Sequence, residues 1–225
     1  NSDVLADINF DSVFKFHKEK NSCLTLVVRQ DDEPEKYSPI HLADDCRINR
    51  FVDVSIEHPT TNIQRVMFTG IQIMEPEIFS RIPANKFCGT TEDIFPTMIE
   101  KGLPVYGHLH EKYWIDMGTR ETYIQAQTDA LEGRLALKTS PSKNPEGPLV
   151  VPPVHIGRDC EISNDAQVGP HAVLGDGCRL RSGAVVKNSI LWEGATIGSD
   201  ATIQNSIIGK SVAIENGAQV VDTSI

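Results

Sequence analysis

A repeat of six residues constrains the fold of this chain more than any other feature of its sequence. From residue 156 onward an aliphatic side chain recurs at every sixth position, with two shorter steps of five residues. Glycine often follows the aliphatic residue, and alanine or cysteine often precedes it by two positions. The twelve aliphatic positions are Ile156, Ile162, Val168, Leu174, Leu180, Val186, Leu191, Ile197, Ile203, Ile208, Ile214 and Val220.

This pattern predicts an all-β, left-handed parallel β-helix over residues 154–225. Each unit supplies one short strand and one corner, and three units complete a coil, so twelve units predict about four coils that pack only against their neighbours. The aliphatic side chain points inward, while glycine, Asn or Asp accepts the strained corner geometry. An ordinary β-sandwich is the alternative, but it would not hold a strict period of six over this length.

Composition excludes several classes of function. The net charge is -10, from 31 acidic and 21 basic residues, and no Lys/Arg cluster along the chain indicates a nucleic-acid surface. The longest apolar run, residues 23–28, is far shorter than the roughly 20 residues of a membrane span. Five scattered cysteines without a CxxC pair indicate reduced thiols. We therefore expect a cytoplasmic protein that binds neither nucleic acid nor membrane.

Residues 1–138 alternate between helix-like and strand-like stretches, which predicts an α/β domain. A proline-rich linker is expected over residues 139–153, before the β-helix. We expect helices at residues 10–20, 91–101 and 119–132, the last capped by Thr119, and a helical turn that begins at Pro76. We expect strands at residues 23–29, 51–56, 66–74 and 105–109, and a hairpin-like turn at residues 44–45.

Two aspartates are candidates for metal binding. Asp116 lies between a predicted strand and a predicted helix, where open α/β sheets bind their ligands. It is either a metal ligand or a cap of the helix. Asp3 is either a metal ligand or a solvated side chain close to the first residue. The residues alone leave both alternatives open.

These stretches, in this order, resemble the sugar-phosphate nucleotidyltransferases, especially the branch that resembles mannose-1-phosphate guanylyltransferase. Residues 1–4, NSDV, resemble the strand-end motif whose aspartate binds magnesium, and YWIDMGT at residues 113–119 resembles the motif of the second metal-binding aspartate. The resemblance implies that Asp3 and Asp116 are catalytic and hold one Mg²⁺ together.

Other motifs of the same family imply a sugar-binding side of the site. EKYS at residues 35–38 resembles EKYG, and EHP at residues 57–59, followed by FTGI at residues 68–71, resembles EKP and its downstream glycine strand. The substrate-binding residues implied are Glu57, which would hydrogen-bond sugar hydroxyls, His58 in place of the lysine that contacts the sugar phosphate, and Ser38, Thr69 and Gly70. Histidine reaches less far than lysine and is only partly charged near neutral pH.

The family joins a sugar 1-phosphate to a nucleoside triphosphate and releases pyrophosphate. The resemblance therefore implies an α/β, partial Rossmann-like nucleotidyltransferase core, with GDP-mannose as the expected product and a homo-oligomer formed through the β-helix. The glycine-rich loop that grips the triphosphate in the family is absent from these residues. We therefore expect the chain to be a fragment or a natural truncation that is inactive alone.

Two other functions compete with this one. The first is a non-catalytic, nucleotide-sugar-binding regulatory or assembly subunit, which His58, Ser38 and the absent loop favour. The second is a hexapeptide acyltransferase, which would use a histidine of the β-helix. Neither His155 nor His171 lies in a context that marks a catalytic base, and nothing in residues 1–138 indicates binding of acyl-CoA.

Overall fold

The computed structural model describes residues 3–56, 62–135 and 147–225. The chain divides into two compact units, residues 1–114 and residues 115–225. Within the described ranges, no helix is both long enough and apolar enough to cross a membrane.

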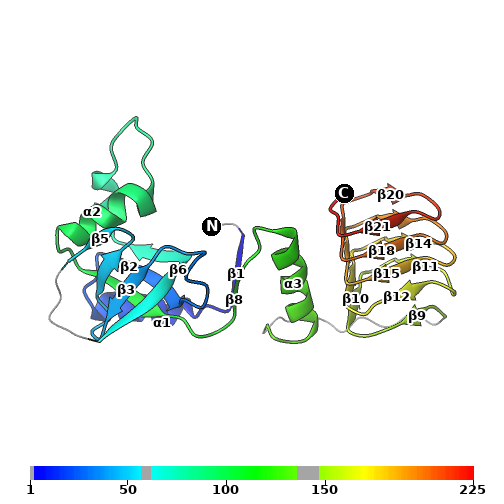
Figure 1. The fold of residues 1–225 in the computed structure, drawn as a ribbon, viewed down its shortest axis with the longest axis horizontal. Coiled ribbons are helices and arrows are strands. Elements are labelled where there is room, and N and C mark those ends of the chain that lie inside the picture. Colours follow the sequence, from blue (N-terminus) through cyan, green and yellow to red (C-terminus); the bar gives the residue numbers. More distant parts are fainter. Residues whose placement is uncertain (1–2, 57–61, 136–146) are drawn as a thin grey trace. The chain divides into compact units, whose positions relative to one another are not determined.

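A six-stranded mixed sheet forms the centre of the first unit (Figure 1). The order of its strands is β5-β4-β3-β6-β2-β7. Strand β2 pairs with β6 in antiparallel and with β7 in parallel orientation, and its first five residues are buried. A continuous apolar run is what a strand buried on both faces requires. The strands are β2 (Leu24–Gln30), β3 (Ile40–Ala43), β4 (Ile48–Phe51), β5 (Val54–Ser55), β6 (Ile63–Met74) and β7 (Val105–Leu109).

The predicted strand at residues 51–56 is wrong. Strand β4 ends at Phe51, Val52 adopts a left-handed conformation with φ of 55°, and the chain turns back to pair as β5. A β-branched residue rarely adopts this conformation, so the sequence did not indicate a turn there. The predicted turn at residues 44–45 is confirmed, because β3 and β4 form an antiparallel pair on either side of it.

Helix α1 (Phe10–Glu19) confirms the first predicted helix. Asn9 caps it by accepting the backbone N–H of Ser12, and Val13 and His17 are its buried residues. Phe14 of the same helix is exposed.

A buried polar network ties α1 to the sheet. Nδ1 of His17 lies 2.8 Å from the hydroxyl of Thr25, and its Nε2 lies 3.2 Å from Oε1 of Glu75. Lys18 also pairs with Glu75. These contacts, with Lys18 the stronger, hold the pKa of Glu75 below its ordinary value. The end of β6 is thereby linked to α1 and β2.

The helix predicted over residues 91–101 has two parts. Thr90–Ile94 is a π-helical turn (η2), and Phe95–Glu100 is an α-helix (α2). Pro96 explains the change, because proline has no N–H to donate and its ring would clash with a carbonyl four residues earlier in a continuous α-helix. The turn predicted at Pro76 is the 3₁₀ helix η1 (Pro76–Arg81).

The second unit begins with helix α3 (Arg120–Leu131) and continues into a parallel β-solenoid (Figure 1). Thr119 caps α3 as predicted, since its hydroxyl accepts the N–H of Thr122. Three parallel sheets form the solenoid walls, two with four strands and one with five. The strands are β9 (Leu149–Val150), β10 (Val154–Ile156), β11 (Glu161–Ile162), β12 (Gln167–Val168), β13 (Ala172–Leu174), β14 (Arg179–Leu180), β15 (Val185–Lys187), β16 (Ile190–Leu191), β17 (Thr196–Ile197), β18 (Thr202–Gln204), β19 (Ile207–Ile208), β20 (Ala213–Ile214) and β21 (Gln219–Val221).

All twelve predicted aliphatic positions lie in strands β10 to β21, which confirms the repeat and its four coils. The solenoid nevertheless starts earlier than residue 154. Strand β9 pairs with β12, so that Val150, six residues before Ile156, continues the same period. Pro152 and Pro153 obscured this unit in the sequence, because paired prolines are typical of a linker.

The two steps of five residues coincide with corners that carry hydrogen-bonded polar side chains. Asn188 and Asn205 adopt left-handed conformations at equivalent corners, and Nδ2 of Asn188 donates to Oδ1 of Asn205 over 3.1 Å. Asn205 donates in turn to Asp222. Beside them, the hydroxyl of Ser189 accepts the N–H of Ser206 over 3.1 Å. Stacked polar side chains thus connect the two shortened corners across successive coils.

The glycines that follow aliphatic residues serve close stacking of the coils. A Cβ at Gly157, Gly175 or Gly198 would lie 2.6 to 2.8 Å from backbone atoms of the next coil. We predicted strained corner conformations for these positions, but none of the three has a positive φ. Left-handed residues occupy other corner positions, such as Gly177 with φ of 69°.

Substitution by alanine separates these two roles of glycine. Gly175→Ala places a methyl group 2.8 Å from the backbone nitrogen of Glu193, so we expect a loss of at least about 2 kcal/mol of unfolding free energy. Gly177→Ala meets open space and only the strain of its backbone conformation, so we expect a loss of about 1 kcal/mol. Urea unfolding followed by circular dichroism measures both. Equal losses, or a larger loss for Gly177→Ala, would contradict the stacking role.

Candidate functional site

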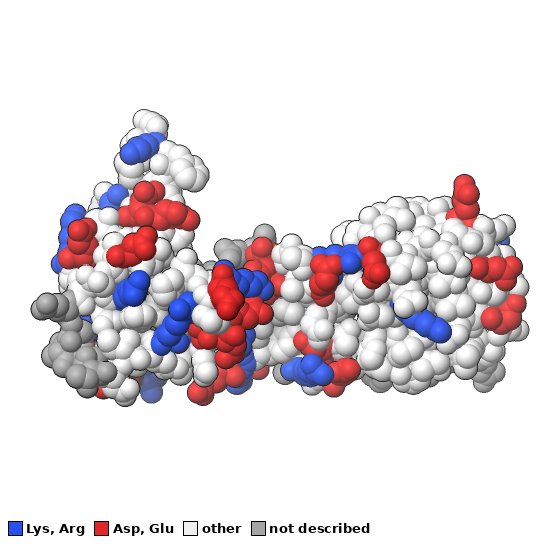
Figure 2. Space-filling view, in the orientation of Figure 1, with Lys and Arg blue, Asp and Glu red and all other residues white. Residues whose placement is uncertain are grey.

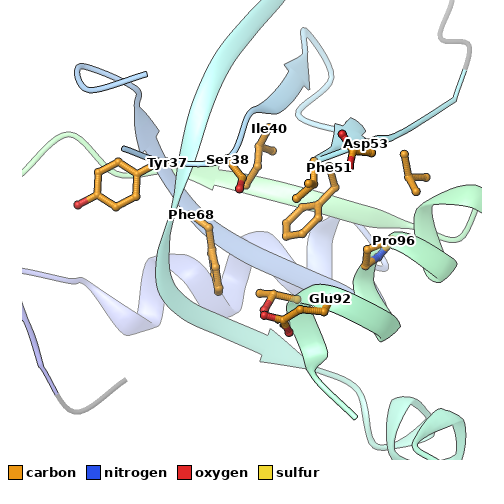
Figure 3. Close-up of a pocket in the computed structure, with 11 residues that line it drawn as sticks. Tyr37, Ser38, Ile40, Phe51, Asp53, Phe68, Glu92 and Pro96 are labelled. Atoms are coloured by element: carbon orange, nitrogen blue, oxygen red, sulfur yellow. Dashed lines mark hydrogen bonds between the residues drawn. The ribbon is translucent and has the colours of Figure 1, made fainter. Parts of the chain in front are cut away.

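A cavity of about 550 Å³ opens on the sheet of the first unit (Figure 3). Three parts of the chain line it: the segment from residue 37 to β5, strand β6, and the helical segment that contains η2 and α2. The lining residues are Tyr37, Ser38, Ile40, Phe51, Val52, Asp53, Val54, Phe68, Thr91, Glu92 and Pro96.

Aromatic rings form one side of the cavity. Phe51 and Phe68 each pack edge-to-face on the fully buried Phe95. Their ring centroids lie 6.0 Å and 6.3 Å, respectively, from that of Phe95. Such pairs add to the stability that burial provides, so the two rings are held in place from beneath. In Figure 3, the Phe51 and Phe68 side chains extend from the sheet strands, and Glu92 and Pro96 belong to the helical segment opposite. An apolar floor with a few polar groups is typical of a small-molecule site.

The polar groups of the cavity are hydroxyls and carboxylates. Ser38, Asp53, Thr91 and Glu92 contribute them, and Thr91 donates its hydroxyl hydrogen to Oε2 of Glu92 over 2.8 Å. A Cβ at Gly89 would lie only 2.0 Å from the same oxygen, so a glycine leaves room for the carboxylate in this position.

No Lys or Arg is among the described residues that line the cavity. Among these described residues, an anionic group would meet two carboxylates and no cation, which is unfavourable at short range. A neutral molecule rich in hydroxyls meets hydrogen-bond acceptors and a flat apolar surface instead. The cavity thus suits a sugar ring better than a phosphate.

The cavity brings together some of the predicted binding residues. Ser38 lines it, and Phe68 represents the FTGI segment in the lining. Thr69 does not line it: Thr69 is buried, and its hydroxyl donates to the carbonyl of Val27 over 2.7 Å. Gly70, with φ of 84°, is not part of the lining either. The pairing of β2 with β6 is irregular beside this residue, and the Thr69 hydroxyl reaches the backbone of β2 instead of the cavity.

Glu57 and His58, predicted to bind the sugar and its phosphate, lie outside the described residues. Their roles remain predictions. The lining residues that sequence analysis missed include Phe51, Asp53, Thr91 and Glu92, which come from two segments distant in sequence. Only the alternation of strand residues, applied to the FTGI motif, could have indicated Phe68.

The two predicted metal-binding aspartates belong to different units. Asp3 is exposed and lies directly before β1 (Val4–Ala6). Asp116 is the last residue of β8 (Trp114–Asp116), and its Oδ1 accepts the N–H of Gly118 over 2.9 Å. Since Thr119 caps α3, Asp116 does not serve as the helix cap.

The described part of the chain contains no group of three or more His, Cys, Asp or Glu side chains placed to hold a metal ion. Mg²⁺ needs fewer protein ligands than this, because it is usually held by one or two carboxylates, water and substrate phosphates. The chemistry of two aspartates therefore fits Mg²⁺. Their joint role remains a prediction.

His171, one of the two solenoid histidines considered for acyl transfer, contacts a side chain of the same unit. Nε2 of His171 lies 3.1 Å from Oε1 of Glu132, close to the end of α3. His171 also occupies a corner in a left-handed conformation, equivalent to that of Asn188. This placement supports its interpretation as part of the solenoid wall.

Comparison with known families identifies the class of protein. Residues 1–133 match the family described as Nucleotidyl transferase, and residues 150–225 match the family described as GMPPB C-terminal domain. The chain belongs to the nucleotidyl transferase family. The expected resemblance is thereby confirmed, and the cavity lies entirely in the part that matches this family.

Several curated relatives share this family. The mannose-1-phosphate guanylyltransferase of Mycobacterium tuberculosis is 26% identical over 201 residues, which cover 83% of this chain and 54% of that protein. The mannose-1-phosphate guanylyltransferase catalytic subunit beta of Danio rerio is 28% identical over 196 residues, which cover 84% of this chain and 52% of that protein. A UTP–glucose-1-phosphate uridylyltransferase of Synechocystis is 26% identical over 203 residues, which cover 83% of this chain and 52% of that protein. The chain spans about half the length of the curated relatives it matches.

Thr69 provides a test of how the chain builds its cavity. Thr69→Val removes the hydroxyl that donates to Val27, so we expect a loss of about 1 kcal/mol of unfolding free energy. Urea unfolding measures this loss. Amide NMR signals of the cavity residues should stay in place, because the side chain faces away from the cavity. Unchanged stability together with displaced signals of Ser38 and Glu92 would contradict this placement.

Proposed function

We propose that this chain provides the sugar-binding side of a sugar-1-phosphate nucleotidyltransferase. The proposed reaction joins a nucleoside triphosphate and a sugar 1-phosphate into a nucleotide-diphosphate sugar, with release of pyrophosphate, and GDP-mannose is the expected product. The observation that carries this proposal is the cavity with an aromatic floor, acidic and hydroxyl groups, and no cation among its described lining residues. Membership of the family and the names of the relatives support the class of reaction.

The cavity would act by positioning the sugar. Asp53 and Glu92 would accept hydrogen bonds from sugar hydroxyls, while Phe51 and Phe68 support the apolar face of the ring. The two carboxylates would keep the phosphate outside the cavity. An oxygen of the sugar phosphate, held outside the cavity, would attack the α-phosphorus of the nucleoside triphosphate, and pyrophosphate would leave. Correct placement of the reacting groups supplies much of the rate enhancement in such transfers.

We expect Asp3 and Asp116 to hold one Mg²⁺, which would neutralise charge on the phosphates when bound. Oδ1 of Asp116 is oriented by Gly118, which favours a fixed position of the carboxylate. Glu57 and His58 would contact sugar hydroxyls and the sugar phosphate. These assignments rest on the family motifs.

We also expect turnover to need a glycine-rich loop for the triphosphate, which these 225 residues do not contain. Nucleoside triphosphate and sugar 1-phosphate are the proposed substrates. Self-association through the solenoid and a cytoplasmic location complete the proposal, and both remain predictions.

A non-catalytic, nucleotide-sugar-binding subunit is the second candidate function. Ser38 favours it, because the family motif has glycine at this position and the serine side chain here lines the cavity. Such a subunit would bind a sugar nucleotide without turnover, and the solenoid would serve assembly.

Sugar binding is tested directly by the loss of an acidic group from the cavity. Glu92→Ala removes a charged hydrogen-bond acceptor, so we expect at least about a tenfold weaker affinity for mannose 1-phosphate in calorimetry. Glu100→Ala is the matched control, because Glu100 is an exposed residue of α2 outside the lining. Equal affinities of the two variants would count against a sugar in this cavity.

Catalysis is tested on the product of the complete reading frame that encodes this chain. We expect pyrophosphate release from GTP and mannose 1-phosphate with Mg²⁺, and UTP with glucose 1-phosphate serves as the alternative pair. Asp116→Asn should lower turnover by at least about a hundredfold, as loss of a charged metal ligand does. Its amide oxygen can still accept the N–H of Gly118, so thermal unfolding should change little. Unaltered turnover would remove Asp116 from the metal site, and failure of every substrate pair would favour the non-catalytic subunit.

A further inference from the structure

A second cavity, of about 360 Å³, lies against the same helical segment as the first. The first cavity, proposed to bind the sugar, is lined by Thr91, Glu92 and Pro96 of this segment. The second cavity is lined by Asp93, Ile94 and Thr97 of the same segment. The lining residues of the second cavity are Arg81, Pro83, Lys86, Phe87, Cys88, Asp93, Ile94, Thr97 and Lys101. The two cavities thus use different faces of η2 and α2.

The second cavity gathers three cations around a single carboxylate. Arg81, Lys86 and Lys101 are exposed, and none of these three side chains forms a hydrogen bond or ion pair with another described residue. Other basic residues of the first unit are paired, as in Lys18 with Glu75 and Arg65 with Asp31. Figure 2 shows a basic side chain near the tip of the segment that projects above the sheet in Figure 1, and acidic side chains at its base.

One carboxylate faces the three cations. Asp93 belongs to the lining, but its Oδ2 already accepts the backbone N–H of Gly89 over 2.9 Å. The formal charge of the lining is therefore positive, in a chain whose net charge is -10. The cations come from the end of η1, the following loop and the residue after α2, so no cluster is visible along the sequence. Unpaired like charges around one hollow favour an anion.

An aromatic ring stands beside these cations. Phe87 lines the cavity and is 94% exposed, the highest value among the exposed large apolar side chains of the described residues. An uncovered ring next to cations can stack on a nucleobase while the cations bind phosphate.

We propose that the second cavity binds a small phosphorylated molecule, with its phosphate groups among Arg81, Lys86 and Lys101 and a nucleobase against Phe87. This site is separate from the sugar cavity and does not depend on the proposed reaction. The helical segment formed by η2 and α2 separates the two sites. It contributes Glu92 to the first cavity and Asp93 to the second.

The test follows backbone amide NMR signals of residues 86–89 in the ¹⁵N-labelled chain. Inorganic pyrophosphate and a nucleoside diphosphate are titrated separately at constant ionic strength. We expect saturable shifts with both, and tighter binding of the nucleoside diphosphate. The local signals report this site directly, so binding at a nucleotide or sugar site elsewhere is not counted.

Two matched double variants decide the role of the cations. Lys86→Gln with Lys101→Gln should weaken binding of pyrophosphate at least about tenfold, because charge-assisted hydrogen bonds are lost. Lys187→Gln with Lys210→Gln removes two solenoid lysines that also lack an ion pair with a described residue, and should leave the affinity within about twofold. Shifts that sodium chloride reproduces, or equal affinities of the two double variants, would overturn the anion site.

Phe87→Ala tests the contact with the base. It should weaken binding of the nucleoside diphosphate by about fivefold or more, as loss of base stacking does, and leave pyrophosphate binding unchanged. Unchanged affinity for the nucleoside diphosphate would overturn the contact with Phe87.

Discussion

Pairing of the buried strand β2 with β6 is the interaction on which the first unit depends. Five consecutive residues of β2 are buried, and β6 lies along its whole length in antiparallel register. Thr69 reinforces the pair, since its hydroxyl reaches across to the carbonyl of Val27. Phe68, which precedes Thr69 in β6 and pairs with Val28, contributes its ring to the cavity. The position of the candidate site is thus a consequence of sheet pairing.

The solenoid depends on contacts between successive coils. Glycines bring the backbones close, aliphatic residues fill the interior, and stacked Asn and Ser side chains close the shortened corners. Because each coil meets the same requirements, the sequence repeats visibly, and all twelve predicted positions were confirmed. Strand β9 was missed because prolines follow it. The glycines after aliphatic residues allow successive coils to approach closely, and a single sequence cannot distinguish this role from a strained corner conformation.

The α/β part was predictable where local pattern decides structure. Helices α1 and α3, with the Thr119 cap, and strands β2, β6 and β7 agree with their predicted positions. The turn at Val52 and the π-helical start of the segment before Pro96 were not predicted, because they depend on the tertiary surroundings and on one unfavourable residue. Local patterns decide regular elements better than they decide such exceptions.

The candidate site was predictable only in part. Motifs pointed to Ser38 and to the strand segment that contains Phe68, but Asp53 and Glu92 reach the cavity from segments with no motif of their own. The cations of the second cavity are likewise brought together only by folding. Side chains that meet through tertiary contacts leave no spacing pattern in one sequence.

The central claim is that the first cavity holds a sugar ring and excludes its phosphate. A crystal structure of the chain with mannose 1-phosphate tests it most directly. We predict the ring between Phe68 and Glu92, with Phe51 beneath it and the phosphate outside the cavity. A phosphate inside the cavity, or a sugar bound elsewhere while this cavity stays empty, would contradict the account.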